Sequence, residues 1–250
     1  MSQQGLPVKQ HIAELRKRLM WAVLSVIVCT ALAFVFHQQI LTMLMEPARG
    51  FSSIPNEKPI FTEMTEYLGI AMKVSLLAGV VLASPFVLLQ LVLFVGPGLK
   101  PVERRYLFAM LPIGFVAFIL GAFFGYRVLF PPAVKFLLTF GGDIATPYIR
   151  IGNYTNLMLT LLFWMGIVFE TPVVLFFLSK IGVVSYQLLS KWRKYAIVAA
   201  FILGAVITPT FDPINQTIVA LPIIVLYELG VWLSRLAGRN RDESEGKPSK

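Results

Sequence analysis

The stretch YTNLMLTLLFWMGIVFETPVVLFFLSK, residues 154–180, contains one charged residue before its final lysine, the carboxylic acid Glu170. A helix needs about 20 apolar residues to cross the hydrocarbon core of a bilayer, and this stretch is long enough. We therefore predict a membrane-spanning helix with an acid near its middle. Pro172 should kink this helix, because proline removes a backbone hydrogen bond.

The composition of the whole chain is that of a membrane protein. Of its 250 residues, 57% are hydrophobic and only 14% are charged, and the mean hydropathy is +0.75. Soluble domains carry about a quarter charged residues. The predicted fold class is all-α, a polytopic membrane protein with a concave face and six transmembrane helices, at residues 20–37, 67–95, 106–130, 154–180, 195–211 and 214–233.

The last two predicted spans are short and form a hairpin. Apolar sequence from Tyr195 to Ile207 is followed by the turn TPTFDP, residues 208–213, and by a second apolar stretch. Such a hairpin should thin the bilayer or lie below one of its surfaces. The loops at 38–66 and 131–153 are rich in Pro and Gly, and we expect short helical pieces there.

The basic residues predict the orientation in the membrane. With the N-terminus inside, sixteen of the 22 lysines and arginines fall on the inner side, as the positive-inside rule requires. An even number of spans returns the C-terminus to the same side. We expect both termini in the cytoplasm, and one membrane domain over residues 1–235 that begins with an amphipathic segment, 1–19. Residues 236–250 should form a disordered cytoplasmic tail.

Several classes of function are excluded by the residue inventory. The net charge of +9 does not indicate nucleic-acid binding, because the basic residues lie at the ends of apolar segments rather than in a stripe. Cys29 is the single cysteine, and with only two histidines a His/Cys metal cluster is excluded. The chain has no Walker loop and no nucleophile elbow, so we expect neither catalytic residues nor a cofactor or metal.

Two carboxylates on the inner side, Glu14 and Glu103, allow two interpretations. In the first interpretation the acids have structural roles only. Glu14 lies four residues before Arg18 and can pair with it. Glu103 lies in the first turn of a helix, where the positive end of the helix dipole stabilises a carboxylate. Alternatively, both acids are available to a cationic ligand, and arginine suits such pairing better than lysine because its guanidinium binds both oxygens.

An acid such as Glu170 costs about 2.5–3.5 kcal/mol at mid-membrane on translocon scales, so we expect it to face a polar cavity. The alternative is a protonated structural glutamate bonded to a neighbouring helix. In the TPTFDP turn, Asp212 should bond its own backbone, whereas Thr208 and Gln216 could bond another transmembrane helix. The motif GAFFG, residues 121–125, hints at a close helix contact.

Four blocks together resemble the TatC family, the multi-span receptor of the twin-arginine protein translocase. They are HIAELRKRL at 11–19, FVGPGL at 94–99 with ERR at 103–105, FETP at 169–172, and TPTFDPINQ at 208–216. The match covers nearly the whole chain, in order. The turn here reads TPTFD where the family often has TPPD, and Thr171 stands where an aliphatic residue is usual.

The resemblance implies a non-enzymatic function in the bacterial inner membrane: export of folded proteins with the proton-motive force. It implies that signal peptides with two arginines bind at Glu14 and Glu103, and that other residues of this site are Arg16, Phe94, Pro97 and Leu99. Glu170 corresponds to the family's intramembrane acid, and Pro47 to a position in the first outer loop. Single-span partners of the TatA and TatB type should contact Thr208, Asp212 and Gln216. A homo-oligomer remains open.

Three other functions compete with this interpretation. A proton-coupled secondary transporter would use Glu170 as its proton carrier, although the two halves of the chain show no repeat. A passive scaffold would use the acids only for caps and pairs. An intramembrane enzyme ranks last, because its second acid would have to be Glu228, near the inner end of the last span.

Overall fold

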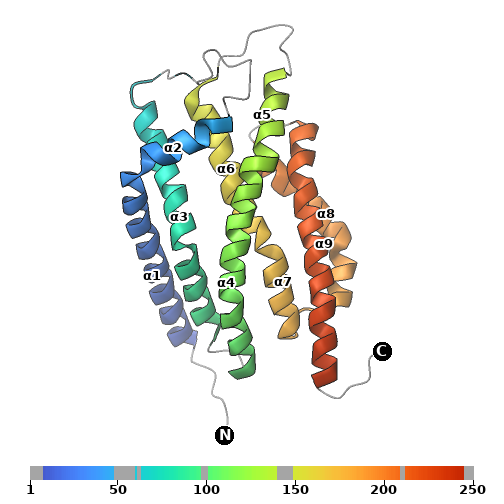
Figure 1. Ribbon diagram of the computed structural model, residues 1–250. Helices are drawn as coiled ribbons and strands as arrows, with labels where there is room; N and C mark the ends of the chain where they lie inside the picture. Colours follow the sequence, from blue (N-terminus) through green and yellow to red (C-terminus); the bar gives the residue numbers. More distant parts are fainter. Residues whose placement is uncertain are drawn as a thin grey trace.

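The computed structural model describes residues 8–47, 60, 63–96, 101–139, 149–208 and 212–244 (Figure 1). These residues are almost entirely helical. The elements are α1 (Val8–Val35), α2 (His37–Met45), α3 (Glu66–Val95), α4 (Pro101–Phe124), the π-helix η4 (Gly125–Leu129), α5 (Phe130–Thr139), α6 (Ile151–Phe169), α7 (Thr171–Lys180), α8 (Tyr186–Ile207) and α9 (Pro213–Ser244). The predicted all-α fold class is confirmed.

Five helical segments in the described part of the chain are long and apolar enough to span a membrane. They are Ile12–Val35, Glu66–Phe94, Arg104–Thr139, Ile151–Lys180 and Pro213–Ala237. The remaining predicted span, 195–211, corresponds to α8, in which charged residues precede the apolar part that begins at Tyr195. The structure therefore has five to six spans, and the short one is the predicted fifth.

Three boundaries differ from the expected ones. The amphipathic segment and the first span form one continuous helix, α1, because no Gly or Pro interrupts residues 8–35. The segment 214–233 is part of the longer helix α9. This helix continues to Ser244, so the described part of the tail expected to be disordered is helical. Arginine and glutamate in this tail are polar, but both residue types favour a helix, as leucine does.

The described parts of the two long loops contain the short helices expected there. α2 follows α1 after a break at Phe36, and α5 follows α4 through η4. In η4 one extra residue enters the helical turn, and the Phe130 N–H bonds to Gly125 O, five residues back. Tyr126 and Leu129 are thereby buried, while Arg127 and Val128 stay exposed.

The helices form a bundle whose main core is centred on α6, with buried side chains from α2, α3, η4, α5, α8 and α9 around it. Its fully buried side chains include Phe130, Met158, Leu161 and Met165. α1 packs on α3, α4 packs on α6, and both α7 and α8 pack on α9. The close contact that GAFFG predicted is present, because a Cβ on Gly121 would collide with the Met165 carbonyl.

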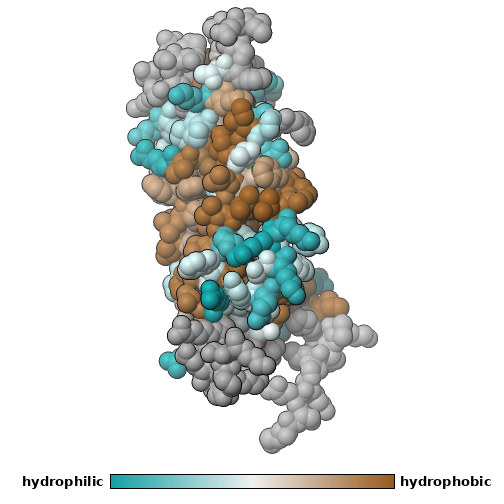
Figure 2. All heavy atoms as spheres, turned by 90° about the vertical axis from the view of Figure 1, so that its right-hand side faces the viewer, coloured by the Kyte–Doolittle hydropathy of each residue, from teal (hydrophilic) through white to brown (hydrophobic). Residues whose placement is uncertain are grey.

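The exterior of the bundle is apolar in its middle and polar towards both ends, as Figure 2 shows for one face. Large apolar side chains remain exposed on every long helix, including Leu19, Leu76, Ile113 and Leu221, which are 51–61% exposed. Water would penalise this surface, whereas a bilayer accommodates it. The chain is a multi-pass membrane protein.

Candidate functional site

The first part of the site lies at the end of the bundle where α1 begins, α3 ends and α4 begins, which we call the basic end (Figure 1). Glu14 and Arg16 both lie on α1, and Arg16 is exposed. Glu14 retains 23% side-chain exposure and accepts one contact from Arg18, with Nη2 at 3.4 Å from Oε1. The pairing interpretation is therefore correct for Glu14, yet the carboxylate is not closed to solvent.

Arg18 also reaches the neighbouring helix. Its Nη1 donates to Oε1 of Gln90 on α3 at 3.5 Å, and Gln90 is only 7% exposed. The Nε of Arg18 is buried and has no hydrogen-bond partner among the described residues. Sequence reasoning missed Gln90, since nothing in a sequence indicates contacts between residues 72 positions apart.

The other expected members of the peptide site lie at the junction of α3 and α4. Phe94 is half-buried in the last turn of α3, and Glu103 lies in the first turn of α4. Pro97, Leu99 and the Glu103 side chain lie outside the described residues. Because α3 contacts both α1 and α4, the turns that carry Glu14 and Glu103 flank the same helix end.

Glu170 lies at a break between two helices. α6 ends at Phe169 and α7 begins at Thr171, with Pro172 in its first turn. Proline has no N–H to donate to the carbonyl four residues back, so the α-helical pattern cannot continue through this point. Backbone bonds resume when the Val174 N–H donates to Glu170 O at 2.9 Å. The predicted kink corresponds to a one-residue interruption at Glu170, whose own N–H donates to Ile167 O at 3.1 Å.

The Glu170 carboxylate points at helices α3 and α4. A Cβ built on Gly114 would lie 3.1 Å from Glu170 Oε2 and 3.3 Å from a methyl group of Leu88. Oε1 is buried and accepts no hydrogen bond from the described residues. These contacts describe one side of the carboxylate, and the residue as a whole is half-buried. That Glu170 faces a polar cavity stays a prediction.

The residues expected to contact partners lie where α8 turns into α9. Asp212 caps α9: its Oδ1 accepts the Asn215 N–H at 2.6 Å. Thr208 is buried, and its hydroxyl donates to Gly204 O at 2.8 Å. Gln216 donates to Phe201 O at 2.8 Å and so joins the two helices. Asp212 thus makes the turn contacts predicted for it, while Thr208 and Gln216 bond within the hairpin.

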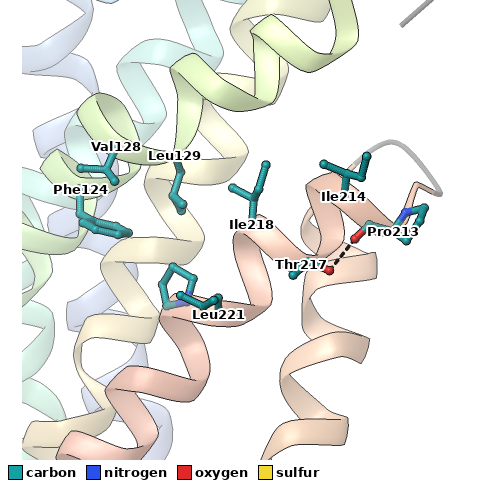
Figure 3. A pocket seen from close by; sticks show the side chains of 9 residues that line it. Phe124, Val128, Leu129, Pro213, Ile214, Thr217, Ile218 and Leu221 are labelled. Atoms are coloured by element: carbon teal, nitrogen blue, oxygen red, sulfur yellow. Dashed lines mark hydrogen bonds between the residues drawn. The ribbon is translucent and has the colours of Figure 1, made fainter.

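Beside this hairpin, an open apolar groove of about 640 Å³ separates α9 from α4 and η4 (Figure 3). Phe124, Val128 and Leu129 line one wall, and Ile214, Ile218 and Leu221 line the other. Val128, Ile214 and Leu221 are at least 50% exposed. The groove offers apolar contact at the level of the membrane, but no charge to orient a ligand.

Contacts between distant segments hold the opposite end of the bundle together. Arg150 Nη2 donates to Glu63 at 2.9 Å, and Glu66 accepts the Gly152 N–H at 2.9 Å. Hydrogen bonding to Glu63 raises the pKa of Arg150. Ile60 pairs with Arg150 as an isolated bridge, so the two long loops are joined here.

α2 lies across this end and is tied to it by two tyrosines. Tyr126 donates to Met43 O at 2.8 Å, and Tyr154 donates to Leu44 O at 3.4 Å. Pro47 follows directly after this fixed helix and is half-buried. Its position is therefore set by the tyrosine contacts to α2.

Glu228, the acid considered as a second catalytic group, is already paired. Arg193 on α8 contacts both of its carboxylate oxygens, at 3.0 and 2.5 Å, and each side chain is 42% exposed. This bidentate ion pair joins α8 to α9. Among the described residues, no group of three or more His, Cys, Asp or Glu could hold a metal ion.

Most of the chain, including the acids described above, matches the model of one protein family. The family described as "Sec-independent protein translocase protein (TatC)" matches residues 10–222. The chain belongs to the TatC family. This match contains Glu14, Glu103 and Glu170, as well as the turn at Asp212.

Two members of the TatC family are similar to this chain along nearly their whole length. The TatC of Aquifex aeolicus is 38% identical over 240 residues, covering 95% of this chain and 98% of the relative. The TatC of Carboxydothermus hydrogenoformans is 35% identical over 235 residues, covering 94% and 95%. Both are called Sec-independent protein translocase proteins.

The fold is also similar to a crystal structure described as the twin-arginine translocase receptor TatC. The TM-score is 0.81 at 36% sequence identity, and the match covers 91% of this chain and 99% of the other. The similarity of nearly whole chains confirms the resemblance drawn from four sequence blocks. It gives no support to a proton-coupled secondary transporter.

Proposed function

We propose that this TatC-family chain is the receptor subunit of a twin-arginine translocase, in the cytoplasmic membrane of a bacterium. The observation that carries the proposal is Glu14, a carboxylate at the basic end that stays part-exposed and has only one long contact to a cation. In a chain with the fold of a twin-arginine receptor, this acid is placed to accept a guanidinium from outside.

The peptide would bind at the basic end through charge and shape. One arginine of the signal would donate two hydrogen bonds to Glu14, and the second would bind Glu103 in the first turn of α4. Phe94 lies at the end of α3 between these turns and would contact the peptide's apolar part, together with Pro97 and Leu99. Arg16, exposed on α1, would attract an acidic group of the peptide.

Assembly would involve Glu170 and single-span partners of the TatA and TatB type. A partner helix with a polar side chain at this depth would donate a hydrogen bond to the buried Glu170 Oε1. The polar side chain of the partner would then also have a hydrogen-bond partner inside the membrane. The hairpin around Thr208, Asp212 and Gln216, with the adjoining groove of α9, offers the apolar surface on which such a helix can pack. The proton-motive force would drive transport, and the subunit itself would catalyse no reaction.

The deciding experiment is photocrosslinking from the exposed position 104, next to Glu103, to a signal peptide with Arg-Arg or with Lys-Lys, in membranes that contain the full chain. We expect crosslinks with Arg-Arg and few with Lys-Lys. A Glu103→Gln variant probed from a neighbouring position should lose the crosslink, while its co-purification with partners survives. Loss of both signals indicates misfolding, and equal crosslinking of the two peptides contradicts the proposal.

A further inference from the structure

Glu14 already faces a guanidinium before any peptide arrives. Arg18 lies four residues along α1, and its Nη2 lies 3.4 Å from Glu14 Oε1. This distance is at the long end for a charge-assisted hydrogen bond. The side chains of Arg18 and Glu14 are 28% and 23% exposed, so the pair lies at the edge of the bundle rather than in its core.

Arg18 has a second acceptor on another helix. Gln90 on α3 is 7% exposed and accepts from Arg18 Nη1 at 3.5 Å. The Nε of Arg18 is buried and donates to none of the described residues. The guanidinium is thus shared between two helices at the long limit of both contacts, and it holds neither acceptor tightly.

We propose that Arg18 is a built-in competitor for the peptide's binding group: it occupies one edge of Glu14 until an arginine of the signal peptide displaces it onto Gln90. The inference rests on the proposed function, in which Glu14 receives that arginine. In the displaced state, Arg18 exchanges its contact with Glu14 for a shorter one with Gln90.

Glu14 favours arginine over lysine for a geometric reason. A guanidinium offers parallel donors to both carboxylate oxygens, so it can regain more than Arg18 gives up. A lysine ammonium is a point charge, which is strongly hydrated and cannot bind both oxygens in the same manner. Displacing Arg18 costs the same free energy whichever peptide binds, so competition lowers both affinities by the same factor.

The test measures the affinity of the purified full-length chain, in lipid nanodiscs, for labelled Arg-Arg and Lys-Lys signal peptides. Arg18→Gln should strengthen binding of both peptides by the same factor, about two- to fivefold, as expected for removal of an exposed ion pair. The ratio of the two affinities should stay the same. Lys17→Gln is the matched control, since Lys17 is exposed, adjacent, and has no ion pair among the described residues.

The control separates specific competition from general charge repulsion. Lys17→Gln removes the same charge but frees no edge of Glu14, so it should strengthen both peptides clearly less than Arg18→Gln does. If Arg18→Gln strengthens binding no more than Lys17→Gln, or weakens both peptides, the inference is overturned. If the wild-type chain shows no preference for Arg-Arg, the proposed function fails instead.

A second variant tests where Arg18 goes. Gln90→Leu removes the alternative acceptor, so Arg18 should stay on Glu14 and Arg-Arg binding should weaken. In the double variant Arg18→Gln/Gln90→Leu this loss should disappear, because no arginine remains to be displaced. A loss that persists in the double variant contradicts the exchange, and the single variant's melting temperature shows whether it is folded.

Discussion

Glu170 and Glu14 are both acids in a membrane protein, but their surroundings differ. Glu14 lies at an edge of the bundle with a cation beside it. Glu170 lies at a helix break against Gly114 and Leu88, and one of its oxygens is buried without a hydrogen bond. A buried polar atom without a partner is costly, so Glu170 is the residue whose burial an added chain would relieve most.

Replacing Glu170 should therefore affect assembly and not peptide binding. We expect Glu170→Ala to keep normal signal-peptide crosslinking and to reduce the yield of complexes with single-span partners. Glu170→Gln keeps a hydrogen-bonding group of the same size and should retain a larger share of that yield. Both are measured by co-purification in mild detergent, and an unchanged yield in the alanine variant would count against the role of Glu170.

Asp212 has two candidate roles, which two substitutions can separate. It caps α9, so Asp212→Ala should lower the free energy of unfolding by about 0.5–2 kcal/mol. Asp212→Asn keeps an oxygen acceptor and should preserve most of that stability. Thermal unfolding in detergent gives the stability, and partner co-purification gives the function. If the asparagine variant is stable yet loses partners, the acid itself makes the contact.

The rod formed by α4, η4 and α5 depends on close packing against α6. A Cβ on Gly121 would collide with the Met165 carbonyl and lie 2.9 Å from Phe169 Cβ. Gly121→Val should therefore lower the melting temperature, because overpacking costs about 1–3 kcal/mol or more. Gly69→Ala is the control, since nothing lies within 4 Å of its Cβ position. Equal melting temperatures for the two variants would show that the helices separate easily.

Local patterns predicted the helices, and they did so for identifiable reasons. Hydropathy marked the long segments, and Pro172 marked the break at Glu170, because both effects act within one stretch of chain. The contact of Arg150 with Glu63 joins residues 87 positions apart, and the pair of Arg193 with Glu228 joins residues 35 positions apart. Periodicity carries no information about such contacts, so neither was predicted.

For the candidate site, as for the helices, the sequence predicted the local features and not the contacts between helices. Glu14 and Glu170 stood out from the sequence as acids in unfavourable places, and the structure locates both. Gln90, which accepts from the Arg18 that pairs with Glu14, and Gly114, which lies beside Glu170, could not be predicted, since they belong to other helices and have no unusual local pattern. What an acid touches depends on tertiary packing, whereas its cost in a membrane can be estimated from the sequence alone.

The arrangement of charge along the bundle predicts its orientation. The start of α1 and the end of α9 lie at the same end, where most of the basic residues were expected (Figure 1). In a chain with Cys29 replaced by serine, single cysteines at the exposed positions Glu46 and Lys191 should report the two sides. A membrane-impermeant maleimide applied to spheroplasts should label Glu46→Cys only.

The opposite labelling result would contradict the predicted orientation. Labelling of Lys191→Cys in intact spheroplasts, with protection of Glu46→Cys, would reverse the orientation and place Glu14 on the outside. Labelling of both after the membrane is disrupted provides the control for reactivity. Because peptide recognition requires Glu14 to face the cytoplasm, this result would also exclude the proposed receptor mechanism.

The π-helix lets this corner lose a residue more easily than its neighbours can. One extra residue is taken up within Gly125–Leu129, so deleting one residue there should restore an ordinary helix and keep α5 nearly in its present rotation. A one-residue deletion in the regular helix before it would instead rotate α5 by about 100°, and Phe130 would leave its edge-on contact with Tyr154, whose ring centroid lies 4.9 Å away. Single-residue deletions should thus be tolerated better within η4 than in the last turns of α4.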